Sequence, residues 1–110
     1  MAKNSNANRL PGRVSGNLQI MGEQIKLARR RRGLSIAAIA ERAQCSELTV
    51  IRVERGTPTV SIGIYARILY GLGLDGDILL LAKDDPAGNA ITNFRLIHKH
   101  EKKKDEDVFD

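Results

Sequence analysis

The sequence predicts an all-α fold, and three observations support that prediction. Aromatic residues make up only 4% of the chain and tryptophan is absent, so a core of Leu, Ile, Val and Ala is expected, which suits packed helices better than a β-sandwich or barrel. Apolar residues recur with the period of an amphipathic helix. Serine precedes several of these segments and glycine follows them, as at helix starts and ends.

The first expected helix begins near Leu18. Before it, residues 1–17 are polar and contain proline and glycine, so we expect a flexible arm there. The helix is expected to end at the cationic run before Gly33, because basic residues in the last turn and a glycine after it are common at helix C-termini. The residues expected on its inward face are Met21, Ile25 and Ala28.

Two short helices follow, joined by a tight turn at Gln44. Ser35 caps the first of them, and Ser46 caps the second, which ends at Gly56. Their spacing meets the requirement of a helix-turn-helix, in which the second helix enters the major groove of DNA. The residues expected on their inward faces are Ile36, Ile39, Ala40, Ala43, Val50 and Val53.

Two more helices complete the expected five-helix domain, residues 18–83. Ser61 opens the fourth helix, with Ile64, Ile68 and Leu69 inward. Asp75 or Asp77 can cap a fifth helix over DILLLAK, before the break at Asp85-Pro86. Residues 84–110 form a C-terminal extension with a possible dimerisation or partner-binding role, in which TNFRLIH is compatible with a strand.

The outward face of helix 46–55 carries side chains suited to reading DNA. Arg52 can make a bidentate contact to guanine, and Glu47 can accept a hydrogen bond from cytosine N4. Leu48 and Thr49 can meet a thymine methyl group. Arg55, Thr57 and Thr59, with backbone amides at the start of the fourth helix, can hold phosphates. The DNA-binding set is completed by the first residues of the two short helices, Ile36 and Ser46.

The charge distribution agrees with a polyanionic partner. The formal net charge is +5. Residues 1–20 carry three bases and no acid, and residues 21–82 carry nine bases and six acids, so each segment has a net charge of +3. Residues 83–110 carry six bases and seven acids, a net charge of −1. The positive excess therefore lies in the arm and the domain, where nucleic acid would bind.

Residues 20–82 resemble the Xre/Cro family of phage-repressor-like regulators, which have a lambda-repressor-like helix-turn-helix fold. The resemblance rests on an ordered series of segments: RRRRGLSIAAIAERA, QCSELTVIRVERG and TPTVSIGIYARILYGLGL. It implies a partly buried ion pair between Arg29 and Glu54 that ties the first helix to the third. Three positions depart from the family pattern. Ile36 replaces a glutamine that contacts the DNA backbone, Gln44 replaces a turn glycine, and Glu47 replaces an amide or arginine.

A narrower resemblance covers the segment TVSIGIYARILYGLGLDGDILLLAKDDPAG. It is similar to HipB-type regulators, the antitoxin partners of HipA-type kinases. This similarity implies that the chain also binds and restrains a kinase toxin and represses the operon that both share.

Several basic residues allow a structural and a functional interpretation. In the run Arg29–Arg32 we expect Arg29 to pair with Glu54 and the others to be solvated or close to DNA. Arg9 and Arg13 can enter a minor groove as an arm, although a disordered leader is the simpler interpretation.

Cys45, His98 and His100 have other possible roles. Cys45 is the only cysteine, so no intrachain disulfide can form, and a packed thiol is favoured over a redox sensor. The two histidines lack a set of further ligands at metal-binding spacing, so neither a metal nor another cofactor is expected.

The fifth helix offers a surface for assembly. Leu74, Ile78, Leu79 and Leu81 provide more apolar surface than a chain end needs, and we expect them both to close the core and to meet a second copy or a partner.

We therefore expect a cytoplasmic, sequence-specific regulator, in particular a repressor that binds a palindromic double-stranded DNA operator as a homodimer. The alternative is a protein–protein interaction module, an antitoxin or adaptor, whose main role is to bind and inhibit a partner. No enzymatic activity is expected, because no catalytic grouping or phosphate loop is recognisable. No membrane association is expected either, because no apolar run approaches the roughly 20 residues of a membrane span.

Overall fold

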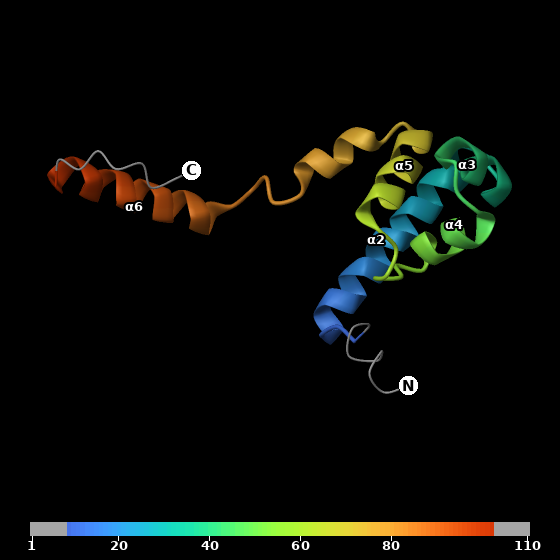
Figure 1. The fold of residues 1–110 in the computed structure, drawn as a ribbon, viewed down its shortest axis with the longest axis horizontal. Helices are drawn as coiled ribbons and strands as arrows, with labels where there is room; N and C mark the ends of the chain where they lie inside the picture. Colours follow the sequence, from blue (N-terminus) through green and yellow to red (C-terminus); the bar gives the residue numbers. More distant parts are fainter. Residues whose placement is uncertain (1–8, 103–110) are drawn as a thin grey trace. The chain divides into compact units, whose positions relative to one another are not determined.

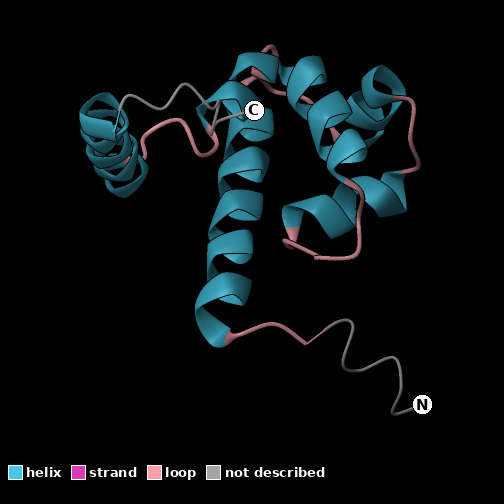
Figure 2. Cartoon of the chain, turned by 60° about the vertical axis from the view of Figure 1, so that its left-hand side comes forward, coloured by secondary structure: helices cyan, strands magenta, loops and turns pink. Residues whose placement is uncertain are grey.

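The computed structural model describes residues 9–102 and contains helices but no strand in that range (Figures 1 and 2). The predicted all-α fold is confirmed. Contacts divide the chain into two compact units, with the boundary between Ile78 and Leu79. The elements in chain order are α2 (Gly12–Arg31), α3 (Ile36–Ala43), α4 (Glu47–Glu54), α5 (Ile62–Leu72), the 3-10 helix η1 (Asp75–Leu80) and α6 (Pro86–Lys102).

The core of the first unit lies among α2, α3, α4 and α5. Helix α3 packs on both α4 and α5, and α2 packs mainly on α4. The largest fully buried side chains are Ile39, Ile68, Val50 and Val53, all from the three shorter helices. Burial of one such side chain stabilises the folded state by about 1.5–3 kcal/mol. Because Val50 and Val53 are held in this core, the opposite side of α4 is left at the surface.

Three serines start the short helices as expected. The hydroxyl of Ser35 accepts a hydrogen bond from the Ala38 amide, and Ser46 and Ser61 act in the same way at α4 and α5. A cap of this kind is typically worth about 1 kcal/mol. These local bonds place the first turns of α3 and α4 independently of the core.

The first helix begins earlier than expected, and the prediction of a flexible arm over residues 1–17 is wrong from Gly12 onward. Pro11 is the residue that precedes the first turn, where a missing amide hydrogen costs nothing, and its carbonyl accepts the first bond from the Ser15 amide. Proline and glycine therefore do not interrupt a helix here. Arg13 consequently lies in the first turn of α2 rather than in an extended arm.

The expected fifth helix is a 3-10 helix, and its leucines do not close the core. Leu79, Leu80 and Leu81 are exposed, with Leu79 retaining 76% of its accessible surface. The core is already closed at this end by Leu72, which is buried, and by Leu74, which packs against the core cluster.

The possible strand at TNFRLIH is also corrected, because these residues lie within α6. The Asp85 carboxylate accepts a hydrogen bond from the Gly88 amide, and Pro86 occupies the first helical position. An aspartate cap and a proline at the first helical position are both strongly preferred at helix N-termini. None of the helices in the described part of the chain is long and apolar enough to cross a membrane.

Candidate nucleic-acid interface

The turn between α3 and α4 has the geometry of a helix-turn-helix. Gln44 takes the left-handed conformation, with φ 56° and ψ 51°, as expected for a residue that stands in place of glycine. Its amide donates to the Glu41 carbonyl, and the Cys45 amide donates to the Ala40 carbonyl at 3.0 Å. These bonds satisfy the last carbonyls of α3 and turn the chain directly into the Ser46 cap of α4.

The outer side of α4 presents a mixed polar and apolar surface. Glu47, Leu48, Arg52 and Arg55 are exposed, and Leu48 retains 53% of its accessible surface. Leu48 and Arg52 lie on the side of α4 opposite the buried Val50 and Val53, as the helical period requires, whereas Glu47 is in the first turn, three residues before Val50. The structure therefore leaves exposed the four residues that the sequence selected for DNA contact, with Glu47 in the first turn of α4 and Arg55 as its C-terminal cap.

Thr49 is only half-buried and its hydroxyl is engaged locally. The Ser46 and Thr49 hydroxyl oxygens lie 2.9 Å apart, and the Thr49 amide donates to the same Ser46 oxygen. Since the hydroxyl is used within the helix, the methyl group is the part of Thr49 best suited to an apolar contact with a thymine methyl group.

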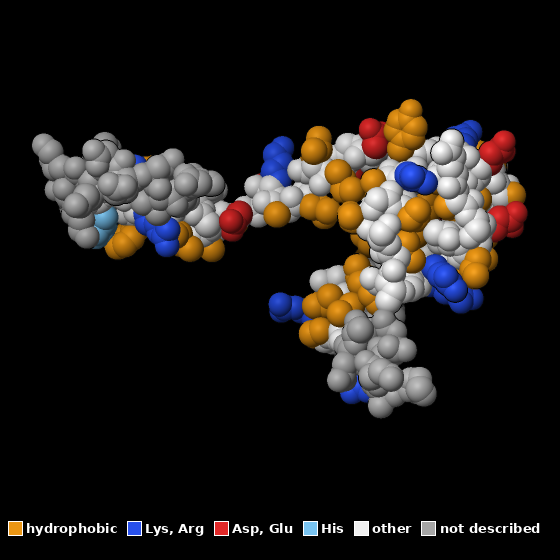
Figure 3. Space-filling model, viewed as in Figure 1, with side chains coloured by type: hydrophobic (Ala, Val, Ile, Leu, Met, Phe, Trp, Pro, Cys, Tyr) orange, Lys and Arg blue, Asp and Glu red, His pale blue; other side chains and the backbone are white. Residues whose placement is uncertain are grey.

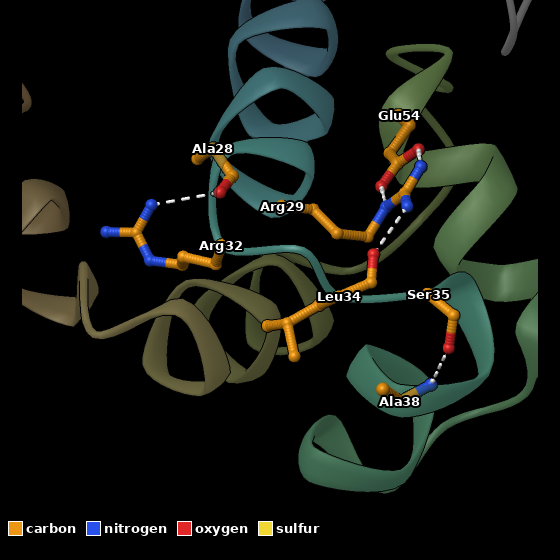
Figure 4. A network of polar contacts seen from close by, with 7 residues as sticks. All are labelled: Ala28, Arg29, Arg32, Leu34, Ser35, Ala38 and Glu54. Atoms are coloured by element: carbon orange, nitrogen blue, oxygen red, sulfur yellow. Dashed lines mark hydrogen bonds and ion pairs between the residues drawn. The ribbon is translucent and has the colours of Figure 1, made fainter.

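The ion pair implied by the family resemblance is present in the structure (Figure 4). Arg29 Nε lies 2.6 Å from Glu54 Oε2, and Arg29 Nη2 donates to Glu54 Oε1 at 3.0 Å. The third nitrogen, Nη1, donates to the Leu34 carbonyl. Both residues are buried, and the hydrogen bond to Glu54 raises the pKa of the Arg29 guanidinium above its already high value. The pair fixes the C-terminal end of α4 against α2.

The remaining arginines of the cationic run differ from one another. Arg32 donates to the Ala28 carbonyl at 2.9 Å, so it supports the end of α2 (Figure 4). Arg30 and Arg31 are exposed neighbours that project from different sides of the helix.

Two glycines set the distance between α2 and α4: Gly22, which sequence reasoning missed, and Gly56, which was expected only as the end of a helix. A Cβ atom at Gly22 would lie 2.6 Å from the Glu54 carbonyl oxygen, and one at Gly56 would collide with the Leu18 carbonyl. Gly56 also has a φ of 76°, which other residues rarely adopt. The position of Gly22 on the buried face of α2, in line with Ile25 and Arg29, is the signal that could have identified it.

Tyr65 also escaped the sequence analysis. It is buried in α5, and its hydroxyl donates to the Thr57 carbonyl at 3.0 Å. Burial raises the pKa of the Tyr65 phenol. Through this bond α5 holds Thr57, which is half-buried, at the end of α4, whereas Thr59 is exposed.

Cys45 is half-buried in the turn. Burial raises the pKa of its thiol, and Arg67 opposes this only in part. A raised pKa favours the protonated thiol and argues for packing rather than redox sensing. His98 belongs to α6, where its ring lies against Phe94 with the ring centres 4.0 Å apart. The side chain of His100 lies outside the described residues.

The residues predicted to form an assembly surface are divided between the two units. Leu74 and Ile78 are half-buried in the first unit, whereas Leu79 and Leu81 are exposed and belong to the second. Ile36, also half-buried, packs beside the core at the start of α3.

Comparison with known proteins agrees with this geometry. A family model described as a helix-turn-helix domain matches residues 20–80, which include the C-terminal part of α2, all of α3, α4 and α5, and η1. No curated protein and no solved structure gives a match. Because more than half of the chain lies within the family match, this protein belongs to the helix-turn-helix domain family, whose architecture is that of DNA-binding regulators.

Proposed function

We propose that this chain is a sequence-specific transcriptional regulator that represses by occupying its operator. The observation that carries the proposal is the outward face of α4. An arginine suited to guanine and an apolar side chain suited to thymine lie together there, and an acid suited to cytosine lies in the first turn of the same helix, which is fixed by a buried ion pair. A rigid reading helix is what direct contact with base edges requires.

In this proposal α4 lies in the major groove of DNA. Arg52 contacts a guanine edge and Glu47 accepts from cytosine, while Arg55 and Thr57 contact phosphates beside the groove. The base contacts determine which sequence is bound, and the phosphate contacts set the orientation of the domain. Occupation of a promoter would then exclude RNA polymerase.

We further propose that the regulator acts as a homodimer on a palindrome. Two copies would place two α4 helices about 34 Å apart, one turn of the duplex. Support comes from the exposed apolar residues of the second unit, which includes Leu79 and Leu81 and the α6 residues Ile91, Phe94 and Ile97. Figure 3 shows hydrophobic side chains on the surface of this unit.

The same apolar residues favour a second candidate function, in which the chain binds and inhibits a protein partner. The resemblance to HipB-type regulators would make that partner a HipA-like kinase toxin. Co-purification with the product of an adjacent kinase gene, and loss of kinase inhibition when Phe94 is replaced, would favour this candidate.

Selection of bound duplexes from a random 30-base-pair pool tests DNA recognition. We expect the full chain to enrich one palindromic sequence and to bind it at least 10³-fold more tightly than the unselected pool. No enrichment over repeated rounds, with the protein folded, would contradict sequence-specific binding. Enrichment of a single half-site would contradict the dimer alone.

A further inference from the structure

A groove between α2 and α4 extends beyond the residues so far assigned to DNA contact. Its volume is about 440 Å³, and its walls come from α2, the first residue of α3 and the C-terminal half of α4. The buried Arg29–Glu54 pair lies among its lining residues. Since these two charges neutralise one another, the character of the groove depends on its other side chains.

Those side chains are predominantly basic. Lys26 and Arg30 come from α2, and Arg55 comes from the end of α4. Lys26 and Arg30 are four residues apart and therefore lie on the same face of the helix. The only other charged residue that lines the groove is Glu23, so four basic and two acidic side chains give the groove a net charge of +2.

The apolar residues of the groove are Ile36 and Ile51, both half-buried. Ile36 and Ile51 have no hydrogen-bonding side chain and cannot bind a phosphate. Any phosphate contact in this groove must therefore come from its other side chains. The basic side chains of α2 line the same groove and have suitable donors.

We propose that Lys26 and Arg30 of α2, together with Arg55, form a phosphate-binding groove that holds the DNA backbone beside the major groove read by α4. This inference rests on the proposed function. The occupant is the DNA backbone rather than an acidic peptide because the C-terminal half of α4, the proposed reading helix, forms one wall of the groove. Lys26 and Arg30 thus contribute affinity but no sequence preference.

Salt dependence of binding tests the groove. The full-length chain and the variants Lys26→Gln, Arg30→Gln and the double variant are titrated with two labelled 30-base-pair duplexes, one selected and one of mixed sequence, at several KCl concentrations. Arg31→Gln is the matched control. Arg31 is the exposed neighbour of Arg30 and does not line the groove, so its substitution removes the same charge from a position outside the groove. Helicity and Tm are measured for every variant.

Each lost phosphate contact should reduce the slope of log Kd against log salt by about 0.9. We expect that reduction for Lys26→Gln and Arg30→Gln and about twice as much for the double variant, equally on both duplexes. Arg31→Gln should leave the slope unchanged, and so should Lys26→Arg, because arginine retains the positive charge in the groove. Equal effects of Arg30→Gln and Arg31→Gln, or an unchanged slope in the folded double variant, would overturn the groove alone. Failure of the unaltered chain to bind either duplex would overturn the proposed function as well.

Discussion

Gly22 of α2 lies directly against the backbone of Glu54, so close that a Cβ atom at position 22 would be 2.6 Å from the Glu54 carbonyl oxygen. The carbonyl oxygen of Glu54 is a main-chain atom, so it cannot move without moving α4. Farther along α2, Arg29 binds the side chain of the same glutamate. Glu54 is therefore held through its backbone by one α2 residue and through its carboxylate by another, which fixes the reading helix relative to α2.

Gly22→Ala should destabilise the domain. The added methyl group overpacks the contact with Glu54, which costs about 1–3 kcal/mol. This cost exceeds the roughly 1 kcal/mol by which alanine stabilises an α-helix relative to glycine. The matched control is Gly16→Ala, also in α2, where no atom lies within 4 Å of the added methyl group. That change should stabilise the domain by up to about 1 kcal/mol. Urea unfolding measures both, and the same sign for the two variants would contradict the close contact.

Arg29 and Glu54 should depend on one another. Arg29→Met leaves a buried carboxylate without its partner, and Glu54→Leu leaves a buried guanidinium, so each single change should cost about 3 kcal/mol. The double variant should cost less than the sum, and less than the worse of the two single changes. A double-mutant cycle by denaturant unfolding checks this, and strictly additive losses would show that the pair is not energetically coupled.

Local signals predict the helix-turn-helix itself because each of them acts within a few residues. Ser35, Ser46 and Ser61 bond to amides three positions ahead, and the period of α4 alone determines that Val50 and Val53 are buried. The exposure of Leu48 and Arg52 follows from the same period. The Arg29–Glu54 pair spans 25 residues and was expected only because a family pattern implied it.

The features that sequence reasoning missed depend on contacts between distant segments or on a weak local balance. The need for glycine at position 22 arises from Glu54, and the role of Tyr65 arises from the Thr57 carbonyl, neither of which a local window includes. Pro11 suggested a break although it starts α2. The stretch of leucines in η1 suggested a core helix, but the core is already filled by residues such as Leu72.

Gln44→Gly should stabilise the turn. Gln44 has a φ of 56°, and relief of that strain should stabilise the folded state by about 1 kcal/mol. Part of this gain is offset because glycine increases the conformational entropy of the unfolded chain. The reciprocal change is Gly73→Ala, at a φ of 78° at the end of α5, which should destabilise by a similar amount. Midpoints of urea unfolding test the pair. A loss of stability in Gln44→Gly would mean that the glutamine side chain makes a contact that outweighs the strain.

Arg52→Ala should weaken binding to the selected operator by about 1–3 kcal/mol, or roughly 5- to 150-fold, and should relax the preference at one base pair. Binding to mixed-sequence DNA should change much less. Arg31→Ala is the control, since it removes the same charge from an exposed position outside α4. Fluorescence anisotropy with both duplexes gives the comparison. Equal losses on the two duplexes would assign Arg52 to a phosphate instead of a base.

Phe94→Glu should weaken self-association. Ile91, Phe94 and Ile97 are exposed at helical spacing along α6, and burial of this stripe against a second copy would be opposed by a charge at its centre. Asn89→Glu adds the same charge to α6 off the stripe and should have little effect. Sedimentation at micromolar concentration should show a dimer for the unaltered chain and for Asn89→Glu, but mainly monomer for Phe94→Glu.

Operator binding should follow the same order, because a monomer reaches only one half-site and loses the gain from linking two. The first unit should stay folded in Phe94→Glu, since the substituted residue belongs to the second unit. Retained helicity and a cooperative unfolding transition would verify this, with a lower midpoint expected because the dimer is lost. Truncation after Pro86 should likewise weaken the dimer and lower operator affinity steeply while each monomer stays folded. If the unaltered chain sediments as a monomer and binds each half-site independently, the stripe is not a dimer interface, and a protein partner such as a kinase becomes its expected occupant.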